Sequence, residues 1–239
     1  MHKLDLPYKI FSLGDAAVCI DLGNKIDEDL NRKVIAMHNC LIGNPFEGLK
    51  DIGIAYSSLS IYYDPIAVQK KNKPGSTSFE FIKQNLETAY RESFAIEENN
   101  NDIIHIPVCY SNDFGVDMGF LIIDKNISRE EIIHLHTSKI YRVYMIGFLP
   151  GFSYMGKVDE KLMIPRKPKP VPVVAGSVGI AGSQTGIYPL DTPGGWQIIG
   201  RTPLKLFNSD AAVPVTLNIG NQIKFYEISK EEFEKLNLT

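Results

Sequence analysis

Residues 164–203 read IPRKPKPVPVVAGSVGIAGSQTGIYPLDTPGGWQIIGRTP, and residues 147–156 before them read GFLPGFSYMG. The segment from Gly147 to Pro203 holds 10 of the chain's 19 glycines and 8 of its 14 prolines. Glycine permits positive φ and close backbone approach, while proline fixes φ and removes a donor. Two interpretations follow. The segment is a set of short strands joined by tight turns, or its irregular backbone forms a pocket or a recognition surface.

The bulk composition is that of an ordinary globular protein, with 239 residues, 44% hydrophobic and 22% charged. A net charge of −3 gives no electrostatic reason to expect nucleic acid or an anionic membrane as partner. No apolar run approaches the ~20 residues of a membrane span. The three cysteines are far apart and form no CxxC pair, which is typical of a reducing compartment. We therefore expect a cytoplasmic protein without a membrane or nucleic-acid partner.

The first hundred residues predict a small α+β unit. Two short apolar runs between residues 8 and 21, split by a Gly-Asp pair, indicate a hairpin. Asp27 can cap a helix, residues 52–63 are rich in β-branched and aromatic residues and predict one strand, and Thr77 with Glu80 forms a capping box for a second helix. This β-β-α-β-α order favours an α+β sandwich, of a ferredoxin-like kind.

An acidic, polar stretch, EENNND at residues 97–102, predicts the domain boundary. We accordingly expect a small α+β domain over residues 1–98 and a second domain over residues 99–239.

The second half predicts a β-rich domain. Ser128 and Glu131 form a capping box that begins a helix, and from Tyr141 onward only short apolar runs appear between glycines and prolines. This pattern favours a barrel or sandwich with one helix. Ser229 and Glu232 predict a short final helix.

The common catalytic motifs are missing from the sequence. It contains no GxxxxGK[ST] phosphate loop and no GxSxG nucleophile turn. His134 and His136 lie two apart on a predicted helix, so they point to different faces and predict no metal site. His136 lies at the end of that helix, where it either faces a pocket or is a hydrogen-bonded structural histidine.

Two arginines flank a segment of very low charge. From Val173 to Gly200 the one formally charged side chain is Asp191, and Arg166 and Arg201 stand on either side. A guanidinium binds carboxylate or phosphate with two parallel hydrogen bonds, although an ordinary surface ion pair is an equal alternative. The candidate groups that would surround a ligand are Phe148, Pro150, Gly151, Ser177, Gln184, Thr185, Tyr188, Gly194, Gly195 and Trp196.

These residues together carry a family resemblance. The motifs, in chain order, are Gly14-Asp15, Tyr63-Asp64-Pro65, Ile106-Pro107-Val108-x-Tyr110, Asp117, His136, Tyr141-x-Val143, Gly147-Phe148-x-Pro150-Gly151-Phe152, Pro165-Arg166, Ala175-Gly176-Ser177-Val178, Gln184-Thr185-Gly186, Tyr188-Pro189 and Pro193-Gly194-Gly195-Trp196 through Gly200-Arg201-Thr202-Pro203. Over nearly the full chain, this ordered set resembles the KipI/PxpB family. The family is also known as allophanate hydrolase subunit 1, or subdomain C/D of the carboxyltransferase domain.

The resemblance implies a fold: an N-terminal ferredoxin-like α/β sandwich and a C-terminal cyclophilin-like β-barrel. It also implies an activity, that of the PxpB-type subunit of an ATP-dependent 5-oxoprolinase. Such a subunit acts with a KipA/PxpC-type partner and a LamB/YcsF-type subunit to convert 5-oxoproline to L-glutamate. Other members inhibit a sporulation histidine kinase or form part of allophanate hydrolase and urea carboxylase, and these alternatives stay open.

The resemblance further implies the site. Arg166, Arg201 and His136 would be catalytic, and the ten residues from Phe148 to Trp196 named above would bind substrate. ATP would be bound together with the partner subunit, and no prosthetic group or structural metal is expected. One departure concerns the loop between Pro165 and Val174, which is one residue shorter than in the family and lacks its second arginine. Lys169 offers a charge there, but without bidentate geometry.

Overall fold

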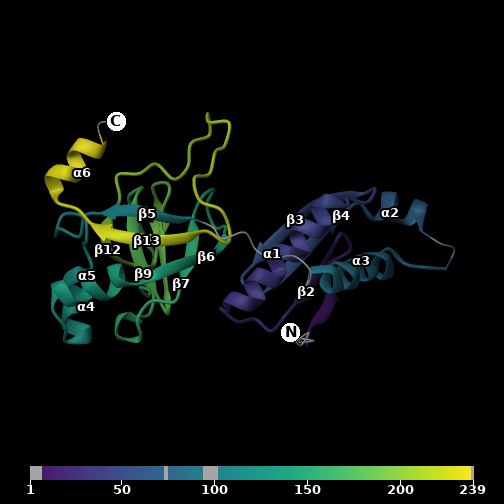
Figure 1. Cartoon of the computed structure of the whole chain (residues 1–239), viewed down its shortest axis with the longest axis horizontal. Coiled ribbons are helices and arrows are strands. Elements are labelled where there is room, and N and C mark those ends of the chain that lie inside the picture. The colour runs from purple at the N-terminus through teal and green to yellow at the C-terminus, as the bar shows by residue number, and fades with distance from the viewer. Residues whose placement is uncertain (1–6, 73–74, 94–101, 238–239) are drawn as a thin grey trace. The chain divides into compact units, whose positions relative to one another are not determined.

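The computed structural model describes residues 7–72, 75–93 and 102–237. The chain divides into two compact units, residues 1–100 and residues 101–239 (Figure 1). Both units mix helices with strands, so the predicted combination of helix and sheet in one chain is confirmed.

The N-terminal unit is a four-stranded antiparallel sheet with helices. Its elements are β1 (Lys9–Ser12), β2 (Ala17–Asp21), α1 (Glu28–Gly43), β3 (Leu49–Ala55), β4 (Ser58–Tyr63), α2 (Pro65–Lys71) and α3 (Ser78–Glu92), and the strand order is β1-β2-β4-β3. The hairpin of β1 and β2 is the one predicted. Ile20 and Ile61 on the sheet pack with Met37 of α1 and Leu86 of α3, and all four are fully buried, so the core lies between the sheet and these helices.

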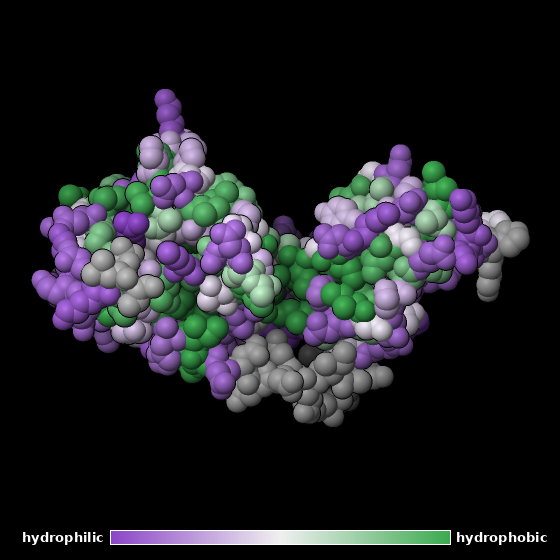
Figure 2. Space-filling view, turned by 90° about the horizontal axis from the view of Figure 1, so that it is seen from above, coloured by the Kyte–Doolittle hydropathy of each residue, from purple (hydrophilic) through white to green (hydrophobic). Residues whose placement is uncertain are grey.

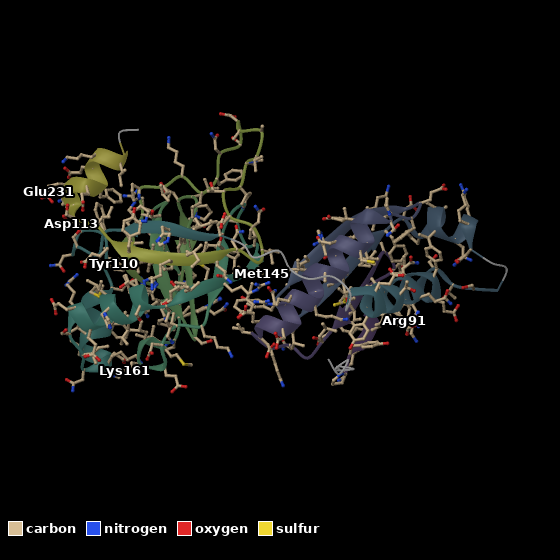
Figure 3. All side chains as sticks on the ribbon, viewed as in Figure 1. Arg91, Tyr110, Asp113, Met145, Lys161 and Glu231 are labelled. Carbon is tan, nitrogen blue, oxygen red and sulfur yellow. The ribbon has the colours of Figure 1, made fainter. Side chains whose placement is uncertain are left out.

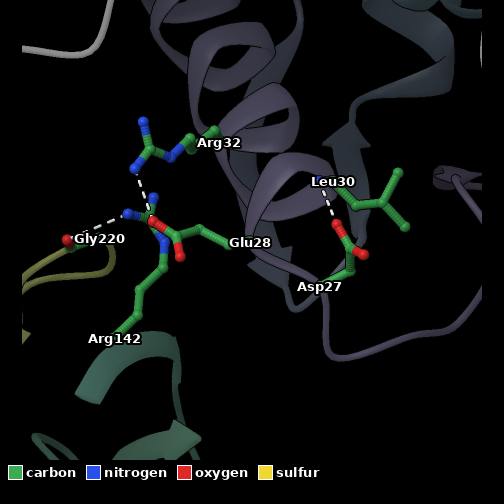
Figure 4. A network of polar contacts seen from close by, with 6 residues as sticks. All are labelled: Asp27, Glu28, Leu30, Arg32, Arg142 and Gly220. Carbon is green, nitrogen blue, oxygen red and sulfur yellow. Dashed lines mark hydrogen bonds and ion pairs between the residues drawn. The ribbon is translucent and has the colours of Figure 1, made fainter. Parts of the chain in front are cut away.

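The helix starts of this unit are the predicted ones. The Asp27 carboxylate accepts a hydrogen bond from the amide of Leu30 at 3.1 Å (Figure 4). Thr77 and Glu80 exchange hydrogen bonds in a complete capping box at the start of α3. Each cap satisfies amides that the first helical turn leaves without partners.

Two expectations for this unit are corrected. Residues 52–63 are not one strand, because the chain reverses at Tyr56, whose φ is +41°, and β3 pairs antiparallel with β4. An apolar run does not reveal such a reversal, since both strands of the hairpin are apolar. The expected order β-β-α-β-α also lacks helix α2, which directly follows β4 and is capped by Asp64 through bonds from the amides of Ile66 and Ala67.

The C-terminal unit contains a seven-stranded sheet in the order β12-β9-β10-β7-β6-β13-β5. These strands are β5 (Ile103–Val108), β6 (Ile140–Ile146), β7 (Ser153–Gly156), β9 (Ser177–Ala181), β10 (Gln184–Ile187), β12 (Gln197–Arg201) and β13 (Gln222–Glu227), and a separate ribbon pairs β8 (Val171–Val173) with β11 (Thr192–Gly194). The helical elements are α4 (Met118–Lys125), α5 (Arg129–Ser138), the 3₁₀ turn η2 (Glu160–Leu162) and α6 (Lys230–Asn237). Of the strand pairs in the sheet, β5 and β13 run parallel.

This sheet curls into a half-barrel. Cys109, the residue after β5, and Arg201, the last residue of β12, exchange two backbone hydrogen bonds of 2.9 and 3.0 Å, which join the two edges of the sheet. The inside holds a large apolar cluster that includes Met155 and Ile180, covered by Leu121 of α4 and Ile132 of α5. Curling and this closure remove exposed edges over part of the sheet.

Two helices were predicted for this unit and are present, and the helix that was not predicted is α4. Helices α5 and α6 begin at the expected caps, with the Ser128 hydroxyl accepting from the amide of Glu131 and the Ser229 hydroxyl accepting from that of Glu232. Helix α4 has no such signal, because Asp117 makes no side-chain cap and its sequence MGFLIIDK has no polar face. A helix that is apolar on both sides has no amphipathic period to detect.

Two glycines leave room for the aromatic layer outside the sheet. A Cβ at Gly186 would lie 3.0 Å from Trp196 Cζ3 and 2.9 Å from the Ser153 carbonyl oxygen, and one at Gly179 would lie 3.1 Å from Trp196 Cβ. The tryptophan therefore lies directly against the backbone of β9 and β10.

We expect Gly186→Ala to destabilise the C-terminal unit by about 1–3 kcal/mol, because the added methyl group meets a backbone oxygen and a packed ring. The matched control is Gly119→Ala in α4, where a Cβ meets nothing within 4 Å. That change should raise the stability by up to about 1 kcal/mol through helix propensity. Urea unfolding followed by Trp196 fluorescence, the single tryptophan, reports on this unit. Equal midpoints for the two variants would contradict the packing argument.

Candidate functional site

An aromatic cluster covers the outer face of the curled sheet. Phe152, Tyr188 and Trp196 are buried there, and Tyr154 packs against them. The Trp196 ring lies edge-on to Phe152 at 5.3 Å and to Tyr154 at 5.8 Å. Trp196 is 4% exposed, so the ring anchors this cluster.

The turn before Trp196 is built on the Tyr188 hydroxyl. That hydroxyl accepts a hydrogen bond from the Trp196 amide, and burial raises the pKa of Tyr188. A Cβ at Gly194 would overlap the same oxygen, so glycine is required at this position. The carbonyl of Gly195 accepts from the amide of Lys167 at 2.7 Å, which fixes the loop that carries Arg166.

Arg166 is exposed above this cluster. Its guanidinium carbon lies 5.9 Å from the centre of the Trp196 ring, within the range of a cation–π contact. Within the described ranges no ion pair joins Arg166 to a carboxylate. Its charge opposes the rise that burial produces in the pKa of Tyr154. Arg166 therefore offers a positioned cation that is open to an external anion.

Sequence reasoning missed the pair that supports this loop. Lys167 Nζ lies 2.5 Å from Asp117 Oδ2, and the same carboxylate oxygen accepts from the amide of Ile198 at 2.7 Å. Asp117 thereby ties α4, β12 and the Arg166 loop together. Asp117 belongs to the ordered motifs of the sequence, but nothing near it in the chain indicates its partner fifty residues on.

Arg201 stands at the opposite end of β12 from Trp196. Its Nε donates to the Ala175 carbonyl at 2.8 Å, and its guanidinium carbon lies 5.9 Å from the rings of both Phe114 and Phe233. Ser177 is its register partner on β9. For this arginine too, the described part of the chain supplies no carboxylate partner.

His136 and Thr185 lie inside the curled sheet, and both are 0% exposed. The Thr185 hydroxyl donates to the Gly179 carbonyl at 3.1 Å, so its one hydrogen is used. His136 Nε2, 2.9 Å from Thr185 Oγ1, must therefore be the donor, and Nδ1 accepts from the Tyr110 hydroxyl at 2.8 Å. Burial lowers the pKa of His136 to about 3, so the ring is neutral. Of the two readings of His136, the geometry is that of the hydrogen-bonded structural histidine.

The predicted site residues thus fall into separate places. The outer face of the sheet holds Arg166, Tyr188, Gly194, Gly195 and Trp196, and its inside holds His136 and Thr185. The joined edges carry Arg201 and Ser177, and β10 begins with Gln184. The loop between β6 and β7 contains Phe148, Pro150 and Gly151. Thr185 and Trp196 do not line one pocket. Trp196 packs against Gly186, and Thr185 and Gly186 are successive residues of one strand that face opposite sides of the sheet. Phe148 is 63% exposed and has a φ of +69°.

A pocket of about 380 Å³ opens at the carboxyl ends of β5 and β13, lined by none of the predicted residues. The two cationic side chains that line it, Arg129 and Lys230, already have hydrogen-bond or ion-pair partners. Arg129 donates to the Tyr110 carbonyl at 2.5 Å and to Asn112, and Lys230 pairs with Asp113 at 2.6 Å beside α6 (Figure 3). The pocket is therefore not a ready site for an anion.

The described ranges contain neither a metal cluster nor a helix suited to a bilayer. No group of three or more His, Cys, Asp or Glu side chains there is placed to hold a metal ion. Among the same residues, no helix has the length and apolar character that crossing a membrane requires.

Comparison with known proteins first shows the family to which the chain belongs. The fold matches the Kluyveromyces lactis urea carboxylase with a TM-score of 0.74 at 17% identity, covering 98% of this chain and 23% of that chain. It also matches TTHA0988 with a TM-score of 0.75 at 31% identity, covering 89% of this chain and 40% of that one. The fold is thus one that occurs as a domain within larger proteins. Residues 8–217 match the model of the carboxyltransferase domain, subdomain C and D, and the chain belongs to that family.

A curated relative matches over nearly the full length. The chain is 42% identical to a 5-oxoprolinase subunit of Bacillus subtilis over 228 residues, which cover 95% of each protein. The family resemblance inferred from the ordered motifs is therefore confirmed.

The neutral state of His136 predicts a dependence of stability on pH. In the unfolded chain a histidine binds a proton below about pH 6.5, whereas His136 in the folded chain does so near pH 3. The contribution of the neutral His136 to the free energy of unfolding is therefore complete above pH 6.5. It declines as the pH falls toward 3, by about 2 kcal/mol between pH 7 and pH 5. In His136→Gln this part of the decline should vanish. Urea unfolding at both pH values, followed by Trp196 fluorescence, measures it, and an unchanged decline in the variant would refute the assignment.

Proposed function

We propose that this chain is the PxpB-type subunit of an ATP-dependent 5-oxoprolinase, acting with a KipA/PxpC-type subunit and a LamB/YcsF-type subunit to convert 5-oxoproline to L-glutamate. The observation that carries this proposal is the 42% identity to the Bacillus subtilis subunit over 95% of both chains. The likeness to urea carboxylase, at 17% identity, supports a shared fold and no shared substrate.

The finer description of the fold belongs to the same proposal. Two helices packed on a four-stranded antiparallel sheet support a ferredoxin-like N-terminal unit. The curled sheet joined at Cys109 and Arg201 supports a cyclophilin-like barrel in the C-terminal unit.

The arrangement of the arginines supports a site that is completed by another subunit. Arg166 and Arg201 stand at opposite ends of β12, which at about 3.3 Å per residue is too far apart for both to hold one small ligand. Each has a positioned guanidinium without an ion-pair partner in the described part of the chain. The sequence also lacks a phosphate-binding loop. We infer that this chain supplies cationic groups and that a partner supplies most of the nucleotide site.

The proposed reaction, opening of a lactam at the expense of ATP, assigns a role to the two guanidinium groups. A lactam resists hydrolysis, and phosphoryl transfer from ATP to the amide oxygen would make the carbonyl carbon more electrophilic. Water would add to that carbon, the C–N bond would break to free the amine, and hydrolysis of the resulting acyl phosphate would release phosphate. Charge develops on oxygen atoms during that transfer, and a guanidinium held in place stabilises it. Arg166, open above Trp196, is the first candidate for this role, and Arg201 is the second. His136 is fully buried and neutral, so we assign it a positioning role through Thr185 and β10.

Substitution of the arginines tests the proposal. In the reconstituted three-subunit complex, Arg166→Ala should lower kcat/KM for 5-oxoproline-dependent ATP hydrolysis by roughly 10²-fold, because a charged donor is lost where charge develops. Arg201→Ala should lower it as well. Both side chains are partly or largely exposed, so the thermal midpoint should change little.

Lys205→Ala is the control, since Lys205 is an exposed cation of the same unit that is not among the candidate site residues. It should retain the wild-type rate. A complex in which neither arginine affects turnover would remove them from the site. ATP hydrolysis that depends on urea and not on 5-oxoproline would sink the assignment of substrate.

A further inference from the structure

Two phenylalanine rings, Phe114 and Phe233, lie beside the Arg201 guanidinium. On the face shown in Figure 2, hydrophobic residues of both units stand among hydrophilic ones, which is normal for a globular protein. Phe233 is instead buried in a small apolar cluster with Cys109 and Ile228, and Phe114 packs against that cluster. The cluster is separate from the core of the curled sheet, so it is a local structure built next to the end of β12.

The two rings contact one cation together. Their centres are 4.4 Å apart, and the planes are tilted by 36°. The guanidinium carbon of Arg201 lies 5.9 Å from each centre, which is within the range of a cation–π contact for both rings. Phe233 comes from α6 and Phe114 from the loop between β5 and α4, so two elements far apart in the sequence meet at this arginine.

The rest of the Arg201 side chain is held by backbone. Its Nε donates to the Ala175 carbonyl at 2.8 Å, and a Cβ at Gly176 would lie 3.3 Å from Arg201 Cγ. A guanidinium has five N–H donors, and among the described residues an acceptor is found for the one on Nε. The four hydrogens on the two terminal nitrogens therefore remain available for an anion from outside the chain.

The position of the ring pair is itself fixed from two sides. Lys230 of α6 forms an ion pair with Asp113 at 2.6 Å, one residue before Phe114 (Figure 3). Exposed ion pairs of this kind contribute little stability, but this one joins the same two elements as the rings do. The ring contact and the ion pair thus set α6 and the loop in register with each other.

The loop is also fixed to the strand that carries Arg201. A Cβ at Gly115 would lie 2.5 Å from the carbonyl oxygen of Ile199, so the loop backbone lies directly on β12. Arg201 follows Ile199 by two residues in that strand. The Phe114 ring therefore has a defined place relative to the backbone of Arg201.

We propose that Phe114 and Phe233 are positioning residues of the enzyme, which hold the Arg201 guanidinium in one orientation for an anionic oxygen of a ligand, a phosphate of ATP or the carboxylate of 5-oxoproline. An arginine that is already held loses less side-chain freedom when the ligand binds. This inference rests on the proposed function, because it takes Arg201 to contact the ligand. It adds the ring pair and α6, which are not among the sequence motifs.

The order of the arginine is measured on the full chain without partners. The heteronuclear NOE of the Arg201 Nε–Hε group reports motion on the picosecond-to-nanosecond timescale. It should be high in the wild-type chain and should fall in Phe114→Leu, which removes the ring and keeps an apolar side chain. Phe114→Tyr retains the ring and should keep the high value. An Arg201 group that is as mobile in the wild type as in Phe114→Leu would overturn the inference.

The consequence for the reaction is measured in the reconstituted three-subunit complex. Phe114→Leu should lower kcat/KM for 5-oxoproline-dependent ATP hydrolysis by roughly 5-fold or more, and Phe114→Tyr should restore it. In an Arg201→Ala background Phe114→Leu should have no further effect, because the ring acts through the arginine. The substrate whose KM rises identifies the anion. Phe120→Leu is the matched control, since Phe120 is 49% exposed on α4, and it should keep the wild-type rate.

The outcomes separate the two proposals. If the wild-type complex is active and Phe114→Leu is equally active, the positioning role is wrong while the proposed function stands. If Phe114→Leu lowers the rate by the same factor with and without Arg201, the ring is merely structural and the inference is overturned. If the wild-type complex shows no hydrolysis that depends on 5-oxoproline, the proposed function fails and the role in that reaction fails with it, while the NOE still decides whether the rings hold Arg201.

Discussion

Strand β10 presents a hydroxyl to the inside of the curled sheet and bare backbone to the outside, and both layers of the C-terminal unit depend on that alternation. Thr185 points inward, where His136 donates to it at 2.9 Å and Phe225 stacks on the imidazole. Gly186 follows it and leaves the outer face open to Trp196. Successive residues of a strand face opposite sides of the sheet. The register of β10 that places Thr185 against His136 therefore also places Gly186 against Trp196.

The outer layer gives Arg166 its position. Trp196 rests on glycine backbone, its turn is held by the Tyr188 hydroxyl, and the loop of Arg166 is held by Gly195 and by the pair of Lys167 with Asp117. The guanidinium is thus set above a rigid ring while its outer side stays open. Arg201 is fixed in a similar way at the other end of β12, between two phenyl rings. Two oriented cations so far apart support the proposal that this chain contributes groups to a site completed by another subunit.

Local signals in the sequence predicted the helix starts well. The caps at Asp27, Thr77, Ser128 and Ser229 are contacts between residues three apart, so the amino acids that make them are visible together in the chain. The reversal at Tyr56 and helix α4 were missed, because an apolar hairpin and a helix apolar on both faces have no distinctive period. Arg166 and Arg201 were chosen as candidates because they flank a segment nearly free of charge, and their role stays a proposal.

The sequence by itself determined the mixture of elements, the glycine positions that a packed outer layer requires, and the family through its ordered motifs. Only the tertiary structure decided which of the candidate residues meet. Whether Thr185 or Gly186 faces inward depends on strand register. The register of β10 with β7 places Thr185 opposite Met155, thirty residues earlier in the chain, and no local pattern relates the two. For the same reason Asp117 and Lys167 could each be read as surface charges until the fold brought them within 2.5 Å.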